Sequence, residues 1–147
     1  MNPVSVKILK IHEDALVPER QTSGSAGYDL YSYCPEGIEI PPLTPIYIPT
    51  GIKFEIPPSY DIEIRPRSGL STKNMLFLPN SPGTIDSDYR GEIMVCMVNF
   101  SKISFMIEHN MRIAQIILRQ NILINWEIVN NLIITERGSG GFGSTGV

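Results

Sequence analysis

Cysteine and histidine are both scarce in this chain, with two of each among 147 residues. Cys34 and Cys96 have no CxxC spacing and no disulfide-rich context, so the sequence offers neither a thiolate metal site nor a disulfide framework. We expect idle or buried thiols. His12 and His109 lie among charged or polar residues and are expected at the surface. Because neither histidine has a recognisable nucleophile partner, the sequence gives no support to a Ser-His or Cys-His mechanism.

The chain also lacks an excess of basic residues and a long apolar run. Twelve Lys and Arg stand against 15 Asp and Glu, which gives a net charge of −3 and a pI near 5.3. This balance disfavours duplex nucleic acid as a partner and confines any phosphate site to a local arginine cluster. No apolar stretch approaches the roughly 20 residues that span a bilayer, and Met1–Lys7 has no basic leader. We therefore expect a cytoplasmic protein that binds neither nucleic acid nor membrane.

Turn-forming residues, by contrast, are abundant: 12 prolines and 12 glycines separate short runs rich in β-branched residues. Residues 61–65 alternate strictly between polar and apolar side chains, as a strand does when one sheet face is buried. The length is that of one domain, so we predict a single unit over residues 1–147. The pattern as a whole predicts an all-β fold, a jelly roll or a similar closed architecture.

The expected elements are a series of short strands and one short helix. The helix covers Ser68–Asn74 and begins with a serine that we expect to cap it. The expected strands are Val4–Ile11, Tyr28–Ser32, Ile46–Ile48, Gly51–Ile56, Tyr60–Arg65, Glu92–Asn99, Ser104–Ile107, Arg112–Gln120 and Leu123–Val129.

The segment Arg137–Gly146 cannot build a core. Its five glycines make it costly to order, so we expect a flexible C-terminal tail that stays mobile until a ligand holds it. Backbone N–H groups and the side chains of Arg137, Ser144 and Thr145 suit phosphate oxygens, and the ring of Phe142 suits a flat base. A nucleotide has both features. The alternative is a frayed glycine-rich terminus, which is common in proteins.

Two segments nearer the middle carry further groups that suit phosphate or metal. Arg65–Ser71 joins guanidinium, hydroxyl and free N–H groups at the start of the predicted helix, where oxyanions are favoured. An exposed basic turn is an equally simple interpretation of this segment. Asp29 follows a glycine turn within Ser25–Tyr31 and is a candidate metal ligand, although a strand-entry aspartate has the same pattern.

A turn-rich hairpin at Asn80–Gly91 carries Asp86, Asp88 and Tyr89. Unpaired backbone groups at its bend can bind the edge of a base, and the amide of Asn80 can donate and accept at the same time. The plain alternative is an Asx-rich surface turn. On the sequence alone, this hairpin is therefore a candidate base-binding element.

The segment Arg112–Ile117 is a core strand in its apolar part, which leaves Arg112 and Gln115 as its only candidates for ligand contact. Taken in their order along the chain, the five segments resemble the five motifs of the trimeric dUTP diphosphatase (dUTPase) family. The resemblance spans nearly the whole chain, and a chance match of all five is not credible. The matching segments are Ala26–Leu30, Pro66–Leu70, Gly83–Gly91, Arg112–Gln115 and Arg137–Gly146.

The resemblance implies a jelly-roll-like β-barrel that hydrolyses dUTP to dUMP and pyrophosphate, which keeps uracil out of DNA and supplies dUMP for thymidylate synthesis. In such an enzyme Asp86 would orient and deprotonate the attacking water. Tyr89 would lie beneath the deoxyribose, where a 2′-hydroxyl collides. The residues that would bind the uracil edge are Asn80, Thr84, Ile85 and Met94.

The resemblance also implies which groups hold the triphosphate. The phosphate chain would be held by Arg67, Ser68, Gly69 and Gln115. Asp29 would hold Mg²⁺ through its water shell. In the C-terminal lid, residues 137–147, Phe142 would close over the uracil. The γ-phosphate would be held by Arg137, Gly143, Ser144 and Thr145.

These implied roles form a coherent chemistry. Attack at the α-phosphorus needs an in-line water, a base beside it, and positive charge for the departing pyrophosphate. The resemblance further implies a homotrimer in which each active site draws on more than one subunit, and the lid of one chain covers a site of its neighbours. Ordering of the lid over the full triphosphate would couple recognition to rate.

The fourth motif departs from the family pattern at Asn110–Met111, where a glycine and an acidic residue are usual. Asparagine can adopt the left-handed turn of a glycine, but the missing carboxylate leaves the orientation of Arg112 open. Two alternatives remain: a dCTP deaminase, which shares the fold and can share the Arg-Ser motif, and a non-catalytic nucleotide-binding regulator. The hairpin with Asp86 and Tyr89, together with the phenylalanine-bearing tail, favours the dUTPase.

Overall fold

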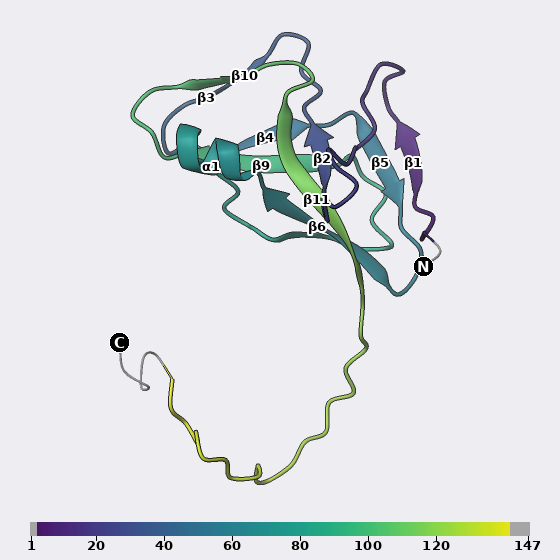
Figure 1. Cartoon of the computed structure of the whole chain (residues 1–147), viewed down its shortest axis with the longest axis vertical. Helices are drawn as coiled ribbons and strands as arrows, with labels where there is room; N and C mark the ends of the chain where they lie inside the picture. The colour runs from purple at the N-terminus through teal and green to yellow at the C-terminus, as the bar shows by residue number, and fades with distance from the viewer. Residues whose placement is uncertain (1–2, 142–147) are drawn as a thin grey trace.

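A computed structural model describes residues 3–141 of the chain as a body of short strands followed by an extended C-terminal arm (Figure 1). The pairs of named strands in this part of the chain are antiparallel. The largest sheet has four strands, in the order β2 (Tyr28–Tyr31), β11 (Arg112–Gln120), β6 (Tyr60–Pro66) and β8 (Gly83–Ile85).

Smaller sheets complete the body. A three-stranded sheet has the order β4 (Ile46–Pro49), β9 (Met94–Asn99) and β7 (Leu76–Phe77). Two further pairs are β1 (Lys7–Lys10) with β5 (Ile52–Glu55), and β3 (Ile38–Ile40) with β10 (Phe105–Ile107). The predicted all-β, jelly-roll-like fold with one short helix is confirmed.

The core lies between these sheets and is largely aliphatic. Completely buried side chains come from β2, β4, β5, β9 and β11, among them Leu30, Ile48, Ile52, Met97 and Ile113. Each side chain of this size stabilises the fold by about 1.5 to 3 kcal/mol when it is removed from water. The ends of the strands, where the chemical groups lie, are therefore anchored to a packed interior.

The predicted helix is confirmed as α1 (Ser68–Asn74), but its predicted cap is wrong. Arg67 holds the N-cap position in an extended conformation (φ −92°, ψ 130°), and no side chain of the described residues caps the helix. The reason is that β6 runs on to Pro66, so the chain turns into the helix one residue earlier than the serine. Ser68 is thus the first helical residue, and its side chain is exposed.

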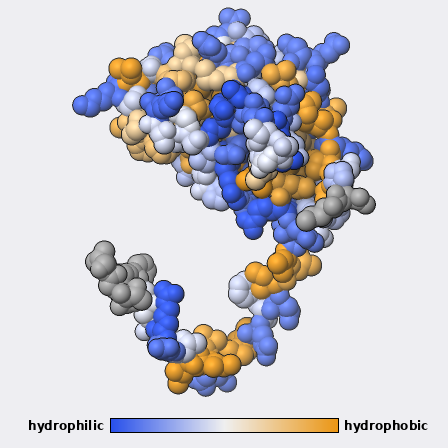
Figure 2. All heavy atoms as spheres, viewed as in Figure 1, coloured by the Kyte–Doolittle hydropathy of each residue, from blue (hydrophilic) through white to orange (hydrophobic). Residues whose placement is uncertain are grey.

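The predicted strand at Leu123–Val129 is wrong. Residues 121–141 leave the end of β11 as an arm that runs away from the body (Figure 1), and none of them is in a strand. The side chains of Leu123 and Ile128 are 95% and 98% exposed, and Figure 2 shows apolar side chains gathered along this arm. The apolar pattern indicated an extended chain correctly, but a strand also needs a partner, and the arm has none within the described chain.

The histidines and Cys34 make structural contacts. His12 stacks on Tyr33 with ring centroids 4.2 Å apart, and His109 meets the same ring edge-on. The Nδ1 atom of His109 accepts a hydrogen bond from the backbone N–H of Cys34. His12 is exposed as expected, whereas His109 is only partly exposed. Both cysteines are free, and burial raises the pKa of the Cys34 thiol, which makes it a weak nucleophile.

Within the described part of the chain, no helix has the length and apolar character that crossing a bilayer requires.

Candidate active site

Three of the residues singled out by sequence meet in what we call the arginine cluster: Asp29, Arg67 and Arg112. Arg67 Nε donates to Asp29 Oδ1 at 3.1 Å, and Arg112 Nη1 donates to Asp29 Oδ2 at 3.3 Å. Arg67 Nη1 also donates to the backbone carbonyl of Arg112 at 3.0 Å. The Asp29 carboxylate is nearly buried, with its side chain 11% exposed, whereas the two arginines are 28% and 43% exposed. One carboxylate thus holds two guanidinium groups at a surface that solvent can reach.

Strand order explains why these residues meet. β11 lies between β2 and β6, so Gln115 stands opposite both Asp29 and Arg65. The register between β11 and β2 shifts between Arg112 and Ala114. Such a bulge re-aims the side chain beside it, and here that side chain is Arg112. Arg67 follows directly after β6, at the turn into α1.

Gln115 is fixed beside the cluster by a hydrogen bond and by a glycine. Its Nε2 atom donates to the carbonyl of Pro66 at 3.0 Å. A Cβ atom placed on Gly27 would occupy the position of the Gln115 amide. The glycine of the first motif therefore makes room for the glutamine of the fourth motif, on the neighbouring strand.

Asn110 and Met111, which depart from the usual fourth motif, fit the turn that leads into β11. Asn110 adopts a positive φ of 59°, as predicted for an asparagine in place of glycine. Met111 packs partly buried against the hydrophobic core. Its backbone N–H is bound by the Ser32 hydroxyl at 3.0 Å. The side chain at position 111 therefore takes part in the core and does not orient Arg112.

Ser68 and Gly69 lie next to the cluster, in the first turn of α1. Both are exposed, and no atom outside the helix lies within 4 Å of a Cβ placed on Gly69. Within the described chain no hydrogen bond occupies the Ser68 hydroxyl. The N–H groups and the hydroxyl at this turn are thus free to meet a ligand beside Arg67.

A second group of predicted residues lies on residues 80–91, which we call the Asp86 hairpin. Asp86 and Tyr89 are joined by a turn in which the Tyr89 N–H donates to the Asp86 carbonyl at 3.2 Å. The Tyr89 hydroxyl donates to the carbonyl of Glu92 at 3.0 Å. Gly91 lets the ring lie against the backbone, because a Cβ there would collide with the Tyr89 ring. Asp86 and Tyr89 are both exposed.

Three of the remaining predicted base-binding residues belong to this hairpin, and Met94 follows it at the start of β9. Thr84 and Ile85 belong to β8 and stand opposite Glu63 and Ile62 of β6. The Asn80 amide lies beside Gly83, at the start of β8. Met94 begins β9, is 37% exposed and pairs with Pro49 of β4.

The arginine cluster and the Asp86 hairpin lie toward opposite ends of β6. Ile85, just before Asp86, stands opposite Ile62, whereas Arg67 follows Pro66 at the other end of the strand. Arg67 is five residues beyond Ile62 along the chain, which is about 17 Å at roughly 3.3 Å per residue. No hydrogen bond or ion pair joins the two groups within residues 3–141.

The tail is described only in part. Arg137 is exposed, and its Nε atom donates to the carbonyl of Gly140 at 2.9 Å. This closes a local turn at the end of the arm. The other predicted lid residues, Phe142, Gly143, Ser144 and Thr145, lie outside the described residues.

Glu63 is a buried glutamate with two arginine partners, and it was not singled out from the sequence. Glu63 is 4% exposed and accepts hydrogen bonds from Arg65 at 2.6 and 2.9 Å and from Arg119 of β11. The Arg65 guanidinium, with Arg119 beside it, holds the pKa of Glu63 below its ordinary value. The alternation of residues 61–65 places Glu63 on a polar face, and only the pairing of β6 with β11 brings Arg119 onto it.

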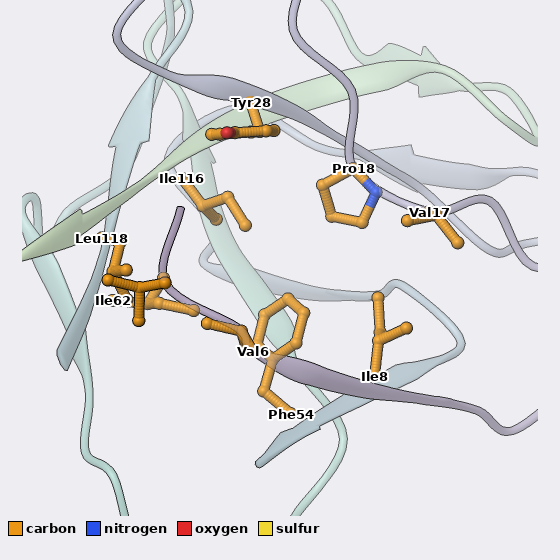
Figure 3. A pocket seen from close by; sticks show the side chains of 10 residues that line it. Val6, Ile8, Val17, Pro18, Tyr28, Phe54, Ile62, Ile116 and Leu118 are labelled. Atoms are coloured by element: carbon orange, nitrogen blue, oxygen red, sulfur yellow. The ribbon is translucent and has the colours of Figure 1, made fainter. Parts of the chain in front are cut away.

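An apolar hollow of the body lies apart from these residues. It encloses about 250 Å³ and is lined by the β1–β5 pair, the Val17–Pro18 turn and side chains of β2, β6 and β11 (Figure 3). Its lining includes Val6, Ile8, Phe54, Ile116 and Leu118, and none of the predicted site residues. Since it presents no charged group, the hollow is not a phosphate site.

The described residues hold no group of three or more His, Cys, Asp and Glu side chains that could bind a metal by itself. Mg²⁺ usually keeps several waters and is bound by one or two carboxylates together with substrate phosphates. Asp29 has the donor chemistry for this, because each carboxylate oxygen has a lone pair beyond the one its arginine uses. The site therefore fits a hydrated Mg²⁺ that arrives with phosphates.

Comparison with known proteins gives the family of this chain. The sequence pattern of the dUTPase family matches residues 13–146. The deoxyuridine 5′-triphosphate nucleotidohydrolase of Leptospira interrogans is 46% identical over 97% of this chain and 99% of that protein, and that of Rickettsia conorii is 48% identical over 100% of both. The solved dUTPase of Staphylococcus bacteriophage 80alpha with dUpNHpp has a TM-score of 0.88 at 26% identity, covering 97% of this chain and 99% of that one. With family pattern, near-full-length relatives and fold in agreement, the chain belongs to the dUTPase family of nucleotide hydrolases.

Proposed function

We propose that this protein hydrolyses dUTP by attack of water on the α-phosphorus, releasing dUMP and pyrophosphate. The observation that carries the proposal is the preformed arginine cluster, in which Asp29 holds Arg67 and Arg112 at an accessible surface. Two guanidinium groups held in this way suit the oxygens of a triphosphate. The relatives named above act on deoxyuridine triphosphate, and the match to them runs over the whole length of this chain.

Asp86 is the proposed base. General bases accept a proton from the attacking group and must lie within hydrogen-bond reach of it. The carboxylate of Asp86 is exposed at a tight turn, where no long-range hydrogen bond holds it within the described chain. A water molecule can therefore approach it.

The phosphate chain is proposed to bind at the turn into α1. Arg67 would bind phosphate oxygens with its free guanidinium N–H groups, and the exposed Ser68 hydroxyl and Gly69 N–H would bind beside it. Gln115 lies one strand away and is fixed on Pro66, so its role is to support this turn. A shell of fixed donors stabilises the charge that develops on pyrophosphate without reorganising during the reaction.

Mg²⁺ is the proposed cofactor, with Asp29 as the residue that would hold it through water. When bound, the ion neutralises charge on the phosphates and on the departing pyrophosphate. Asp29 would thus have two roles, since the same carboxylate orients Arg67 and Arg112.

The Asp86 hairpin is the proposed uracil and deoxyribose site. The Tyr89 ring is fixed against the backbone at Gly91 and by its bond to Glu92, so it presents a rigid face that would exclude a 2′-hydroxyl. Asn80, Thr84 and Ile85 of the same hairpin, with Met94 at the start of β9, would bind the uracil edge. The lid, residues 137–147, would close over the bound nucleotide with Phe142 on the uracil and Arg137, Gly143, Ser144 and Thr145 on the γ-phosphate.

A homotrimer with shared active sites is supported by two features of the single chain. Ile62, which pairs with the residue before the base, lies about 17 Å from Arg67 along β6, at roughly 3.3 Å per residue, so one nucleotide would meet the base and the arginines more readily on different copies. The arm also exposes contiguous apolar side chains, which mark interaction surfaces in proteins. The apolar hollow of Figure 3 offers such a side chain a surface on a neighbouring body.

These proposals place the protein in nucleotide metabolism, where it would remove dUTP before it enters DNA and supply dUMP to thymidylate synthesis. We propose a cytoplasmic location and no nucleic-acid or membrane partner, in keeping with the net charge of −3. Residues 1–147 would then act as one unit.

Pyrophosphate release from dUTP, dCTP, dTTP and UTP, each with and without Mg²⁺, tests the function. We expect release from dUTP alone, dependent on the divalent ion. Equal release from UTP would contradict the role of Tyr89, and equal release from dTTP would contradict the uracil site. Ammonia from dCTP, or unchanged dUTP after long incubation, would refute the proposed reaction.

A further inference from the structure

We propose that Gln21 is a positioning residue that orients Arg112 for triphosphate binding, in place of the carboxylate that this chain lacks at position 111. The inference rests on the proposed function, because it assigns the arginine cluster to phosphate binding. It begins from the finding that Met111 packs against the core, so the residue before Arg112 does not hold its guanidinium group.

The guanidinium of Arg112 is held instead from another loop. Arg112 Nη1 donates to the Gln21 Oε1 atom at 2.8 Å, which is shorter than its 3.3 Å contact with Asp29 Oδ2. A guanidinium group has donors only, so the glutamine must turn its oxygen, not its nitrogen, toward Arg112. One nitrogen of Arg112 thus bridges an amide oxygen and a carboxylate oxygen.

The loop that carries Gln21 is itself anchored. Glu19 and Asp29 exchange backbone hydrogen bonds at 2.7 and 3.2 Å, which fixes the start of the loop beside β2. Arg20 binds the carbonyls of Ser23 and Ser25 across the loop, and its guanidinium lies 5.9 Å from the ring centroid of Tyr28. The position of Gln21 is therefore set by the same strand that places Asp29.

A change at Gln21 would also affect Arg67, because Arg67 Nη1 donates to the carbonyl of Arg112. With Gln21 in place, Arg112 has a fixed backbone and a fixed side chain. Without it, the longer contact to Asp29 is the one side-chain bond that restrains the guanidinium within residues 3–141, and the Arg112 side chain is 43% exposed. We expect substrate binding to weaken and the chemical step to continue at its normal rate, since within the described chain the Gln21 side chain bonds to Arg112 and not to the Asp86 hairpin.

The test compares two substitutions of matched length. Gln21→Met keeps the size of the side chain and removes the acceptor, whereas Gln21→Glu keeps an acceptor. Because loss of a hydrogen bond to a charged group weakens binding, Gln21→Met should raise KM for dUTP about fivefold with kcat within about twofold. Gln21→Glu should restore KM to within about twofold of the starting protein, because the family usually places an acidic group beside this arginine.

The control is Gln120→Met, at the exposed end of β11, where no side-chain hydrogen bond is present within the described chain. It should leave KM unchanged. Thermal unfolding should be equal for all these variants, since Gln21 is exposed. A packing role for Gln21 predicts that methionine is tolerated, so a KM in Gln21→Met equal to that of Gln120→Met would overturn the proposal.

A second readout does not depend on activity. In ¹⁵N-labelled protein, the Nη signals of Arg112, assigned by their loss in Arg112→Lys, report whether the guanidinium rotates freely. We expect restricted signals in the starting protein and in Gln21→Glu, and averaged signals in Gln21→Met. Unchanged Arg112 signals in Gln21→Met would overturn the positioning role even in a protein that hydrolysed dUTP normally. Absence of dUTP hydrolysis in the starting protein would refute the proposed function and leave this spectroscopic result to decide how Arg112 is held.

Discussion

The arginine cluster is held by contacts between residues far apart in the sequence, whereas the turn of the Asp86 hairpin that carries Asp86 and Tyr89 is held by contacts between near neighbours. Asp29 bonds to Arg67 and Arg112, which are 38 and 83 positions away. Tyr89 bonds to Asp86 and Glu92, each three positions away. The phosphate-binding groups are thus built by the sheet, and the proposed base is presented by a turn. The two regions should consequently respond to substitution in different ways.

The difference has an energetic reason. Triphosphate binding needs positive charge that is fixed before the substrate arrives, and long-range ion pairs provide this at the expense of burying a carboxylate. A base must instead be reached by water, so burial would impede it. The 8% exposure of Asp29 and the exposed position of Asp86 follow this division.

Asp86→Asn gives the largest expected effect and acts on chemistry alone. We expect kcat for pyrophosphate release to fall about a thousandfold, because general bases typically contribute 10²- to 10⁴-fold. The melting temperature should stay unchanged, since no long-range contact is lost. Asp88→Asn, at an exposed residue of the same hairpin, is the matched control and should keep full activity. A large fall in melting temperature for Asp86→Asn would remove the distinction between the two regions.

Asp29→Asn should affect binding and stability together. The two arginines lose a charged acceptor, so we expect KM for dUTP to rise about tenfold and the free energy of unfolding to fall by about 1 to 2 kcal/mol. For a chain of this length, each kcal/mol corresponds to about 2 to 4 °C in melting temperature. Steady-state kinetics measure the KM, and thermal unfolding measures the loss of stability. An effect on kcat alone would show that Asp29 acts in the chemical step and not by holding Arg67 and Arg112.

Asn110→Ala tests the backbone beside the cluster. Asn110 has a φ of 59°, and a side chain with a Cβ but no local hydrogen bonding costs about 1 kcal/mol in this region. We expect a melting temperature about 3 °C lower for alanine, from the same conversion of stability to temperature. Asn110→Gly should melt at the same temperature as the starting protein or above it. Equal melting of the alanine and glycine variants would show that the turn is not under conformational restraint.

Glu63 gives the smallest effect, and one that depends on pH. Hydrogen bonds from Arg65 and then Arg119 lower its pKa in the folded state, so folding favours the charged form. Its contribution to stability is complete above the ordinary glutamate pKa of about 4.3 and is lost as the pH falls through the lower folded value. Melting temperatures measured from about pH 6 to pH 3 should fall less steeply in Glu63→Gln. Identical slopes would mean that Glu63 does not contribute.

The sequence predicted the residues of both regions because each chemical group stands in a short motif. Alternation and turn residues also indicated most strands of the body, and β11 was predicted with its observed bounds, Arg112–Gln120. The positive φ of Asn110 followed from its replacement of a glycine. These features depend on local conformational preferences, which a sequence carries directly.

The features that were missed depend on contacts across the fold. The short strands β3 and β7 are formed only by pairing with β10 and β9. No sequence pattern links Gln21 to Arg112, because the bond between them spans 91 positions. The strand predicted at Leu123–Val129 was wrong for the same reason: an apolar run does not say where its partner is.

The proposed active site requires that the base and the arginines serve the same nucleotide from different copies of the chain. Asp86→Asn and Arg67→Ala should each be inactive as pure proteins. When the two are unfolded together and refolded as a mixture, random assembly places an intact Asp86 beside an intact Arg67 in about a quarter of the shared sites. We therefore predict that dUTP hydrolysis by the mixture recovers to about a quarter of the unsubstituted rate. A mixture that stays as inactive as its parents, although mass measurements show mixed trimers, would contradict the account.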